Sequence, residues 1–320
     1  MAAPELRIVE GYERVSRATT PAEAASLIAD YNLPWETVPS QFLTDPGVWD
    51  ALLSAGIGIT ALIRNLGRLT RIGLIAPLAE PTKWVASRLT DQDVLRDGRV
   101  HPLTVLDAFA TYGQGHGVKG SSTWTPVPAI VGALDEAFYL SFGAIEPANK
   151  RTLVGLDVSG SMTWGTIAGS SLQPFQAAGA MAMTVVRTEP EYHTMAFAGT
   201  FQPLALTPSM RLDGVLRAMG NLSFGRTDCA LPMTWAASNR VPVDTFIVFT
   251  DNETWAGGIH PFQALRQYRE LMGIPARLAV VGMTSSGFSI ADPSDGGMLD
   301  LVGFDLATPN ALTAFSRGDC

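Results

Sequence analysis

The sequence predicts a protein of two parts: short stacked helices over residues 1–150, and an α/β domain with a central, mostly parallel sheet over residues 151–320. Before residue 150, apolar residues recur at helical spacing and no stretch alternates with period two. After residue 150, short apolar runs alternate with longer helical stretches, which is typical of a Rossmann-like sheet with right-handed crossovers. Two of these runs lead into aspartates, Asp157 and Asp251.

Helices account for the whole first part. Thr20-Pro21-Ala22-Glu23 has the form of a helix start, and Asn32 with Pro34 ends that helix. Short helices with brief connections favour stacked helical pairs as the architecture. The further helices are predicted after Asp45-Pro46 and at residues 59–69, 85–95, 101–112 and 127–142.

The helix predicted at residues 59–69 carries two arginines away from its apolar face. Its apolar side holds Leu62 and Leu66, whereas Arg64, Asn65 and Arg68 lie towards the other side. The arginines could form a small positive stripe, but a solvated helix face is the favoured interpretation.

The second part reads as a complete α/β unit. Pro174 suits the first turn of a helix whose residues are apolar or small on every face, as in a helix packed on a sheet. Helices are predicted at residues 174–186, 210–219, 231–238 and 261–271, and strands before Asp157 and at residues 192–198, 245–250 and 277–281.

Composition and charge limit the function classes. The chain has 320 residues, 47% hydrophobic and 16% charged, so it is an ordinary globular protein with room for two cores. A net charge of -8, shared about equally by the two halves, argues against a basic nucleic-acid-binding domain, although a local patch remains compatible with it. Cys229 and Cys320 predict neither a disulfide framework nor a zinc site. No apolar leader or long uncharged span occurs, so we expect a cytoplasmic protein without a membrane segment.

Three stretches bring oxygen-bearing side chains to strand ends. Asp157, Ser159 and Ser161 follow the first apolar strand at alternate positions, residues 224–228 offer a hydroxyl before a helix, and Asp251 ends a second apolar strand. In a doubly wound sheet, such groups gather beyond the carboxyl ends of the strands. One or two carboxylates with neutral hydroxyls suit Mg²⁺. The alternative is that Asp157 and Ser159 only cap a turn.

Six residues near these stretches have less specific predicted roles. We expect the polar ones to orient the ligands, whereas the aromatic ones could frame the opening of the site. Large aromatic side chains beside a strand end are, however, more often packed. The residues concerned are Arg226, Asp228, Asn252, Glu253, Trp164 and Trp255.

The run Gly115-His116-Gly117-Val118-Lys119-Gly120 matches a dinucleotide-binding fingerprint but lacks its context. That fingerprint needs a preceding strand and a following helix, and here a helical pattern precedes while two prolines follow. We interpret it as a loop carrying His116 and Lys119. Next to Trp124, it could contact a phosphate and stack a base, although such loops commonly bind nothing.

The Asp-x-Ser-x-Ser, Thr, Asp series resembles the metal-ion-dependent adhesion site of von Willebrand factor A (vWA) domains. The resemblance implies that five residues surround one Mg²⁺ or another divalent cation and leave a position open for an acidic oxygen of a partner. These residues are Asp157, Ser159, Ser161, Thr227 and Asp251.

A second resemblance covers nearly the whole chain from about Pro21 onward. In the first part it is carried by Tyr31-Asn32-Leu33-Pro34-Trp35-Glu36, Val48-Trp49-Asp50-Ala51-Leu52-Leu53, Thr60-Ala61-Leu62-Ile63-Arg64-Asn65-Leu66-Gly67 and His101-Pro102. In the second it is carried by Asp157-Val158-Ser159-Gly160-Ser161-Met162, Thr227-Asp228-Cys229 and Phe249-Thr250-Asp251-Asn252-Glu253-Thr254-Trp255. These runs resemble the Ro autoantigen family, which joins a TROVE helical module to a vWA domain.

The Ro resemblance implies a ring of HEAT-like helical repeats closed by the vWA domain. It also implies binding of small non-coding Y RNAs and of the single-stranded ends of misfolded RNAs, in RNA quality control. Candidate RNA-binding residues are Arg64, Arg68, His116 and Lys119. The family's helical module is usually longer, so this chain resembles a shortened member that lacks the earlier repeats: a minimal protein, a truncated one, or one that rebuilds a ring as a homo-oligomer.

Catalysis has little support in the sequence. The Gly-x-Ser-x-Gly elbow, the His-Glu-x-x-His helix and the phosphate-binding loop are all absent. A phosphatase with Asp157 as nucleophile would usually need an acid at position 159 and a later lysine, whereas the chain has Ser159 and no lysine after Lys150. Two hypotheses remain: a non-catalytic, Ro-like RNA-binding protein, and a protein-interaction module that captures a partner carboxylate at the metal without RNA affinity.

Overall fold

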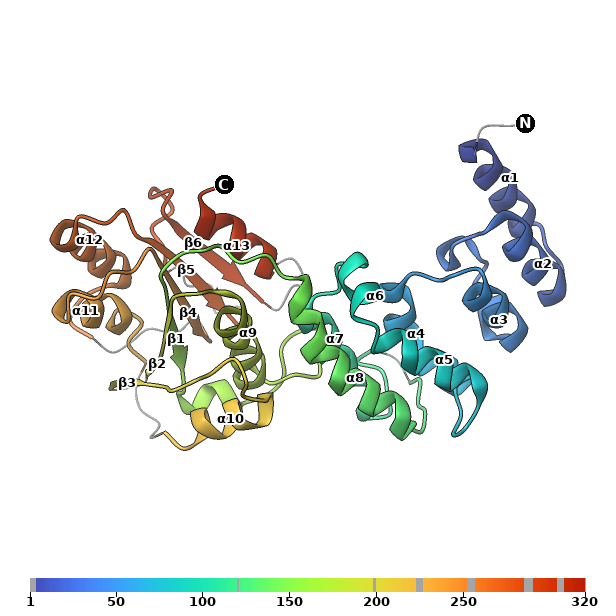
Figure 1. The fold of residues 1–320 in the computed structure, drawn as a ribbon, viewed down its shortest axis with the longest axis horizontal. Helices are drawn as coiled ribbons and strands as arrows, with labels where there is room; N and C mark the ends of the chain where they lie inside the picture. The colour runs from blue at the N-terminus through green and yellow to red at the C-terminus, as the bar shows by residue number, and fades with distance from the viewer. Residues whose placement is uncertain are drawn as a thin grey trace. The chain divides into compact units, whose positions relative to one another are not determined.

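The computed structural model describes residues 4–119, 121–197, 200–222, 227–251, 257–284, 290–303 and 308–319. The chain forms two compact units, Met1–Ala144 and Ile145–Cys320. The first unit is helical and the second contains the sheet (Figure 1). This arrangement confirms the predicted fold class.

The first unit is a series of short helices that pack in sequence. Helix α2 contacts α1 and α3, and α8 contacts α5 and α7. Side chains before the helices accept backbone hydrogen bonds, as Asp45 does from Val48 N and His101 Nδ1 does from Leu103 N. The α-helices are α1 Pro4–Ser16, α2 Pro21–Tyr31, α3 Pro46–Ser54, α4 Ile59–Arg71, α5 Glu80–Leu89, α6 Gln92–Asp97, α7 Pro102–Gly113 and α8 Pro128–Leu140, and the 3-10 turns are Trp35–Thr37, Phe42–Thr44 and Ser141–Ala144.

Two details of the helical prediction were wrong. The helix expected at residues 85–95 is instead the end of α5 and the start of α6, because Asp91 accepts hydrogen bonds from Asp93 N and Val94 N and caps a new helix. Asn65, expected on the outer side of α4, is buried, and its Nδ2 donates to Ala61 O at 2.9 Å. Helix α1 lies outside the predicted set.

The second unit is a six-stranded sheet in the order β3-β2-β1-β4-β5-β6. All neighbours pair in parallel except β2 and β3, which are antiparallel. The strands are β1 Thr152–Asp157, β2 Tyr192–Phe197, β3 Phe201–Pro203, β4 Thr245–Thr250, β5 Arg277–Gly282 and β6 Met298–Val302. The helices are α9 Pro174–Thr188, α10 Leu212–Gly220, α11 Leu231–Ser238, α12 Pro261–Met272 and α13 Thr308–Arg317. The sequence interpretation missed β3, β6 and α13.

Helices cover both faces of this sheet, so its central strands are buried. Helices α11 and α12 lie on one side and α9 and α13 on the other (Figure 1). Alternate β4 residues serve the two faces: Phe246 and Val248 belong to the core under α11 and α12, while Ile247 and Phe249 line a small cavity with residues of α9 and α13. The continuous apolar run that predicted β4 therefore reflects burial on both sides.

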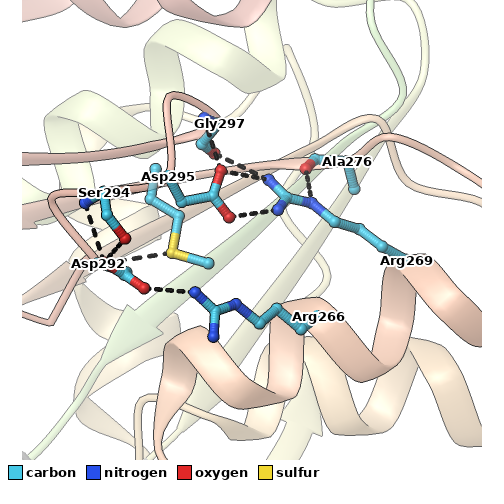
Figure 2. A network of polar contacts seen from close by, with 8 residues as sticks. Arg266, Arg269, Ala276, Asp292, Ser294, Asp295 and Gly297 are labelled. Atoms are coloured by element: carbon cyan, nitrogen blue, oxygen red, sulfur yellow. Dashed lines mark hydrogen bonds and ion pairs between the residues drawn. The ribbon is translucent and has the colours of Figure 1, made fainter.

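Two arginines of α12 tie the segment before β6 to the rest of the unit. Arg266 forms an ion pair with Asp292, and Arg269 forms one with Asp295 (Figure 2). Arg269 also donates from Nε to Ala276 O at 2.7 Å. The chain is thereby fixed to α12 immediately before it enters the edge strand.

Among the residues that the structure describes, no helix is long and apolar enough to cross a membrane.

Replacing Gly155 with alanine should lower the free energy of unfolding by about 1–3 kcal/mol, because added atoms overfill a packed core. A Cβ at this position of β1 would lie 2.9 Å from Pro232 Cγ and 3.4 Å from Phe197 Cε1. Gly214→Ala in α10 is the matched control, since its Cβ would meet Met210 Cε at 3.9 Å. Urea titrations followed by circular dichroism compare the variants. Equal stability of Gly155→Ala and the parent protein would contradict the tight packing of α11 on β1.

Candidate metal centre

The candidate site lies where β1 and β4 end side by side. The register pairs Leu156 with Phe249, so Asp157 and Thr250 terminate adjacent parallel strands at the same edge. Asp251 follows directly. The sequence predicted this placement, because the carboxyl ends of neighbouring parallel strands share one edge of the sheet.

Asp157 is fully buried and takes hydrogen bonds from three segments. Its Oδ1 accepts from Ser159 N at 2.8 Å, and its Oδ2 accepts from Thr250 Oγ1 at 2.7 Å and from Thr227 Oγ1 at 3.4 Å. Burial raises the pKa of this carboxyl to about 6, against the opposing effect of the hydrogen bonds from Ser159 and Thr250. The carboxylate is thus oriented, but its negative charge is poorly solvated.

The serine hydroxyls are held by the turn that follows β1. Ser159 Oγ and Ser161 Oγ lie 3.1 Å apart, and Ser159 is buried. The 3-10 turn Gly160–Thr163 fixes the backbone, with Met162 N donating to Ser159 O at 3.2 Å. Both hydroxyls are therefore held on a single ordered turn.

Asp251 contributes a carboxylate oxygen that lacks a partner. The residue is 6% exposed, and its buried Oδ1 has no hydrogen-bond partner among the described residues. Its backbone is held, since Thr284 Oγ1 donates to Asp251 O at 3.1 Å. A buried carboxylate oxygen without a partner carries a high desolvation cost, which a cation would offset.

The donor set fits a hard cation. Two carboxylates and three hydroxyls supply only oxygen ligands, the set that Mg²⁺ prefers. The set depends on its hydroxyls, since within the described part of the chain no group of three or more His, Cys, Asp or Glu side chains could hold a metal ion. Neither Asp157 nor Asp251 has an ion-pair partner among the described residues. Hydrogen bonds connect four of the five proposed ligands: Asp157 with Ser159 and Thr227, and Ser159 with Ser161. The fifth, Asp251, follows Thr250, whose hydroxyl donates to Asp157.

Two threonines at the site were not among the predicted ligands. Thr250 donates to Asp157, and Thr284 holds the backbone of Asp251. The position of Thr250 at the end of the second apolar run was a usable signal. Thr284 follows β5, and only the pairing of β4 with β5 reveals its role.

The residues predicted to lie beside the ligands differ in their environments. Asp228 caps the turn before α11, accepting from Ala230 N at 2.9 Å, and burial raises its pKa. It lies close against Gly257, where a Cβ would come within 2.4 Å of Asp228 Oδ2. Trp164 is exposed rather than packed. Arg226, Asn252, Glu253 and Trp255 lie outside the described residues.

The candidate RNA-binding arginines of α4 lie in different environments. Arg64 is exposed and lines a cavity of about 470 Å³, together with Trp35 and the first residues of α4. Arg68 is half-buried, with its guanidinium carbon 5.9 Å from the ring centroids of both Trp35 and Trp49. Burial and the nearby Arg71 lower the pKa of Arg68. Only Arg64 therefore matches the solvated helix face that we favoured.

His116 and Lys119 are exposed on a loop that packs against α4. Trp124 at the end of this loop leaves no room for a side chain at Gly67, and Arg71 Nη1 donates to Ser122 Oγ at 2.9 Å. Trp124 also stacks on Tyr112 and donates from Nε1 to Tyr112 O at 3.0 Å. The loop that carries His116 and Lys119 therefore lies beside α4, and the side chain of Trp124 is packed against Tyr112.

Both units match models of known protein families. A family model described as the Ro60 vWA domain matches residues 151–316, and one described as the TROVE domain matches residues 31–111. The protein named RNA-binding protein RO60 in Deinococcus radiodurans is 50% identical over 319 residues, covering 99% of this chain and 60% of the relative. The protein of the same name in Caenorhabditis elegans is 41% identical over 314 residues, covering 98% of this chain and 48% of the relative.

The crystal structure of the Deinococcus radiodurans RO (RSR) protein is also similar. It has a TM-score of 0.92 and 49% sequence identity, and the match covers 100% of this chain and 64% of that one. The chain therefore spans between 48% and 64% of the length of these relatives.

Without divalent metal, the contribution of Asp157 to stability should fall as the pH rises. Its folded-state pKa of about 6 lies above the ordinary value of 3.8, so the folded protein binds the proton more tightly than the unfolded chain. This contribution, at most about 3 kcal/mol, is present below pH 4 and is lost as the pH rises through about 6. Urea unfolding in EDTA between pH 4 and 7.5 measures it.

The controls for this titration are two carboxylate-to-amide variants. Asp157→Asn should lack this pH-dependent contribution, whereas Asp213→Asn, at an exposed ion pair with Arg217, should retain it. An identical pH profile for Asp157→Asn and the parent protein would contradict the burial of an unbalanced carboxylate.

Proposed function

We propose that this chain, which belongs to the Ro60 family, is a non-catalytic RNA-binding protein whose second unit holds a divalent cation. The observation that carries the proposal is the 50% identity, along 99% of the chain, to a relative named as an RNA-binding protein. The matching structure of the Deinococcus radiodurans protein, with its TM-score of 0.92, supports a shared architecture over the whole aligned length.

The helical unit is the proposed RNA-binding part. Arg64 on α4, and His116 and Lys119 on the loop that packs against α4, are exposed cationic or titratable groups in one neighbourhood. The chain carries a net charge of -8, so RNA contact must be confined to such a local set. Arg68 would act indirectly, by ordering Trp35 at the edge of the cavity that Arg64 lines.

The RNA class proposed is a small non-coding, Y-like RNA or the single-stranded end of a misfolded RNA, in RNA quality control. This narrower proposal follows the family resemblance. The chain spans 60% or less of the two RO60 relatives, and we propose that its residues suffice for such binding. The proposal includes a closed ring, formed either within one chain or by homo-oligomerisation.

The cation would be held by Asp157, Ser159, Ser161, Thr227 and Asp251, with Mg²⁺ as the preferred ion. The support is the all-oxygen donor set and the buried Asp251 oxygen that has no partner among the described residues. When bound, the cation would balance the two buried carboxylates and offer an open coordination position to an acidic oxygen. The alternative function, a module that binds a partner carboxylate without RNA affinity, uses the same position.

Added Mg²⁺ should stabilise the protein, by about 2.7 kcal/mol when free metal exceeds its dissociation constant a hundredfold. Ser161→Ala and Asp251→Asn should each weaken the metal-dependent rise in melting temperature, because each removes a proposed ligand. Differential scanning fluorimetry with a magnesium series measures the shift. Asp213→Asn is the matched control and should behave as the parent protein does. Unchanged metal shifts in both ligand variants would refute the assignment.

RNA affinity should depend on salt, with a slope that reports the phosphate contacts. Removing two such contacts in Arg64→Gln/Lys119→Gln should reduce the log–log slope by about 0.7 per contact on single-stranded RNA. Fluorescence anisotropy with oligouridylate and with a Y-like RNA between 50 and about 200 mM salt gives this slope. Arg217→Gln, on an exposed side chain of the second unit, is the control. A slope that the double variant leaves unchanged would place the RNA elsewhere.

A further inference from the structure

Trp164 leaves a large apolar surface in solvent beside the candidate metal centre. Its relative exposure is 75%, the highest of any aromatic side chain in the described part of the protein. Single exposed apolar residues are normal on a protein surface. Tryptophan is nevertheless enriched among residues that dominate binding energy at interfaces, and this one follows two proposed cation ligands on the same turn.

The backbone that carries Trp164 is well fixed. Trp164 N donates to Ser161 O at 2.9 Å, Thr163 Oγ1 donates to Gly160 O at 2.8 Å, and Gln173 Nε2 donates to Thr163 O at 3.2 Å. The exposed side chain therefore has an ordered base, which lowers the conformational entropy lost when a ligand covers it.

The same turn sets the spacing between the backbone of Trp164 and the proposed cation ligand Ser161. In a 3-10 turn, residues three apart lie one above the other, separated by about 6 Å along the axis. Ser161 lies inside this turn and Trp164 ends it with an extended backbone, and the hydrogen bond from Trp164 N to Ser161 O keeps their backbones about one such turn apart. An extended peptide advances about 3.3 to 3.6 Å per residue, so neighbouring or next-neighbouring side chains of one segment could reach both features.

We propose that Trp164 anchors a docking surface for an extended segment of a partner protein. The segment presents an Asp or Glu carboxylate to the cation and packs a bulky apolar side chain, one or two residues away, on the indole. The inference rests on the cation site proposed above and adds the second half of the recognition element.

Charge favours a peptide over RNA as the occupant of this surface. From residue 151 onward the chain contains ten arginines and no lysine against fourteen aspartates and glutamates. A polynucleotide would bring a row of phosphates to this acidic unit, whereas a peptide needs to bring one carboxylate.

The test uses ¹⁹F NMR of the full chain labelled with 5-fluorotryptophan, with the Trp164 resonance assigned from Trp164→Phe. The probes are capped hexapeptides, Gly-Gly-Leu-Asp-Gly-Gly and the same peptide with Asn for Asp or Ala for Leu. In excess Mg²⁺ the Leu-Asp peptide should shift the Trp164 resonance and bind. EDTA or the Asp-to-Asn change should abolish binding, and Leu-to-Ala should weaken it.

Isothermal titration calorimetry measures the variants that lack this resonance, and Trp164→Ala should weaken binding of the Leu-Asp peptide about thirtyfold, the size of a hot-spot effect. Trp164→Phe should retain most of the affinity, and Leu271→Ala, at an exposed apolar residue of α12, should not change it. Unaltered affinity in Trp164→Ala, absence of peptide binding in the parent protein, or a larger shift of the resonance by oligouridylate than by the peptide overturns the inference.

The thermal shift with Mg²⁺ separates the two levels of failure. If the parent protein and Trp164→Ala both keep the shift while the peptide result is negative, only the docking surface is wrong. If the parent protein shows no shift, the cation site itself is wrong and the docking surface is wrong with it.

Discussion

The parallel pairing of β1 with β4 is the constraint on which the second unit depends. It ends both strands at one level and brings Asp157 beside Thr250, with Asp251 next in the chain. Two carboxylates are thereby buried close together without an ion pair among the described residues, which opposes folding. Hydroxyl groups suit this position because they can donate to a carboxylate and also offer lone pairs to a cation. The hydroxyls of Thr250 and Thr227 do the first in this structure.

The helical unit uses its charge differently. Arg68 packs against Trp35 and Trp49, which stack on each other, while Arg64, four residues earlier on α4, stays exposed at the cavity. One helix thus divides its cations between packing and the surface. In an acidic protein, a polyanion can bind only where exposed cations such as Arg64 outweigh the nearby negative charge.

Sequence patterns predicted what depends on local chemistry. The buried runs of β1 and β4 and the alternate spacing of Asp157, Ser159 and Ser161 are visible in short stretches. Edge strands β3 and β6 were missed because β3 has three residues and β6 is only partly buried, so neither gives a clear apolar run. The break between α5 and α6 was missed because apolar spacing continues across the cap at Asp91. Thr284 joins the site through sheet pairing, which no local pattern encodes.

The clamp formed by Arg266 and Arg269 has a mechanical consequence. Thr284 touches the rim of the candidate site, whereas residues 290–297 are held at α12 by two ion pairs, and Asp300 accepts hydrogen bonds from Ile290 N and Ala291 N. The outer strand β6 therefore has two attachments to the unit: it pairs with β5, and the residues just before it are held at α12. Loss of the ion pairs would leave β6 attached through a single neighbour in the sheet.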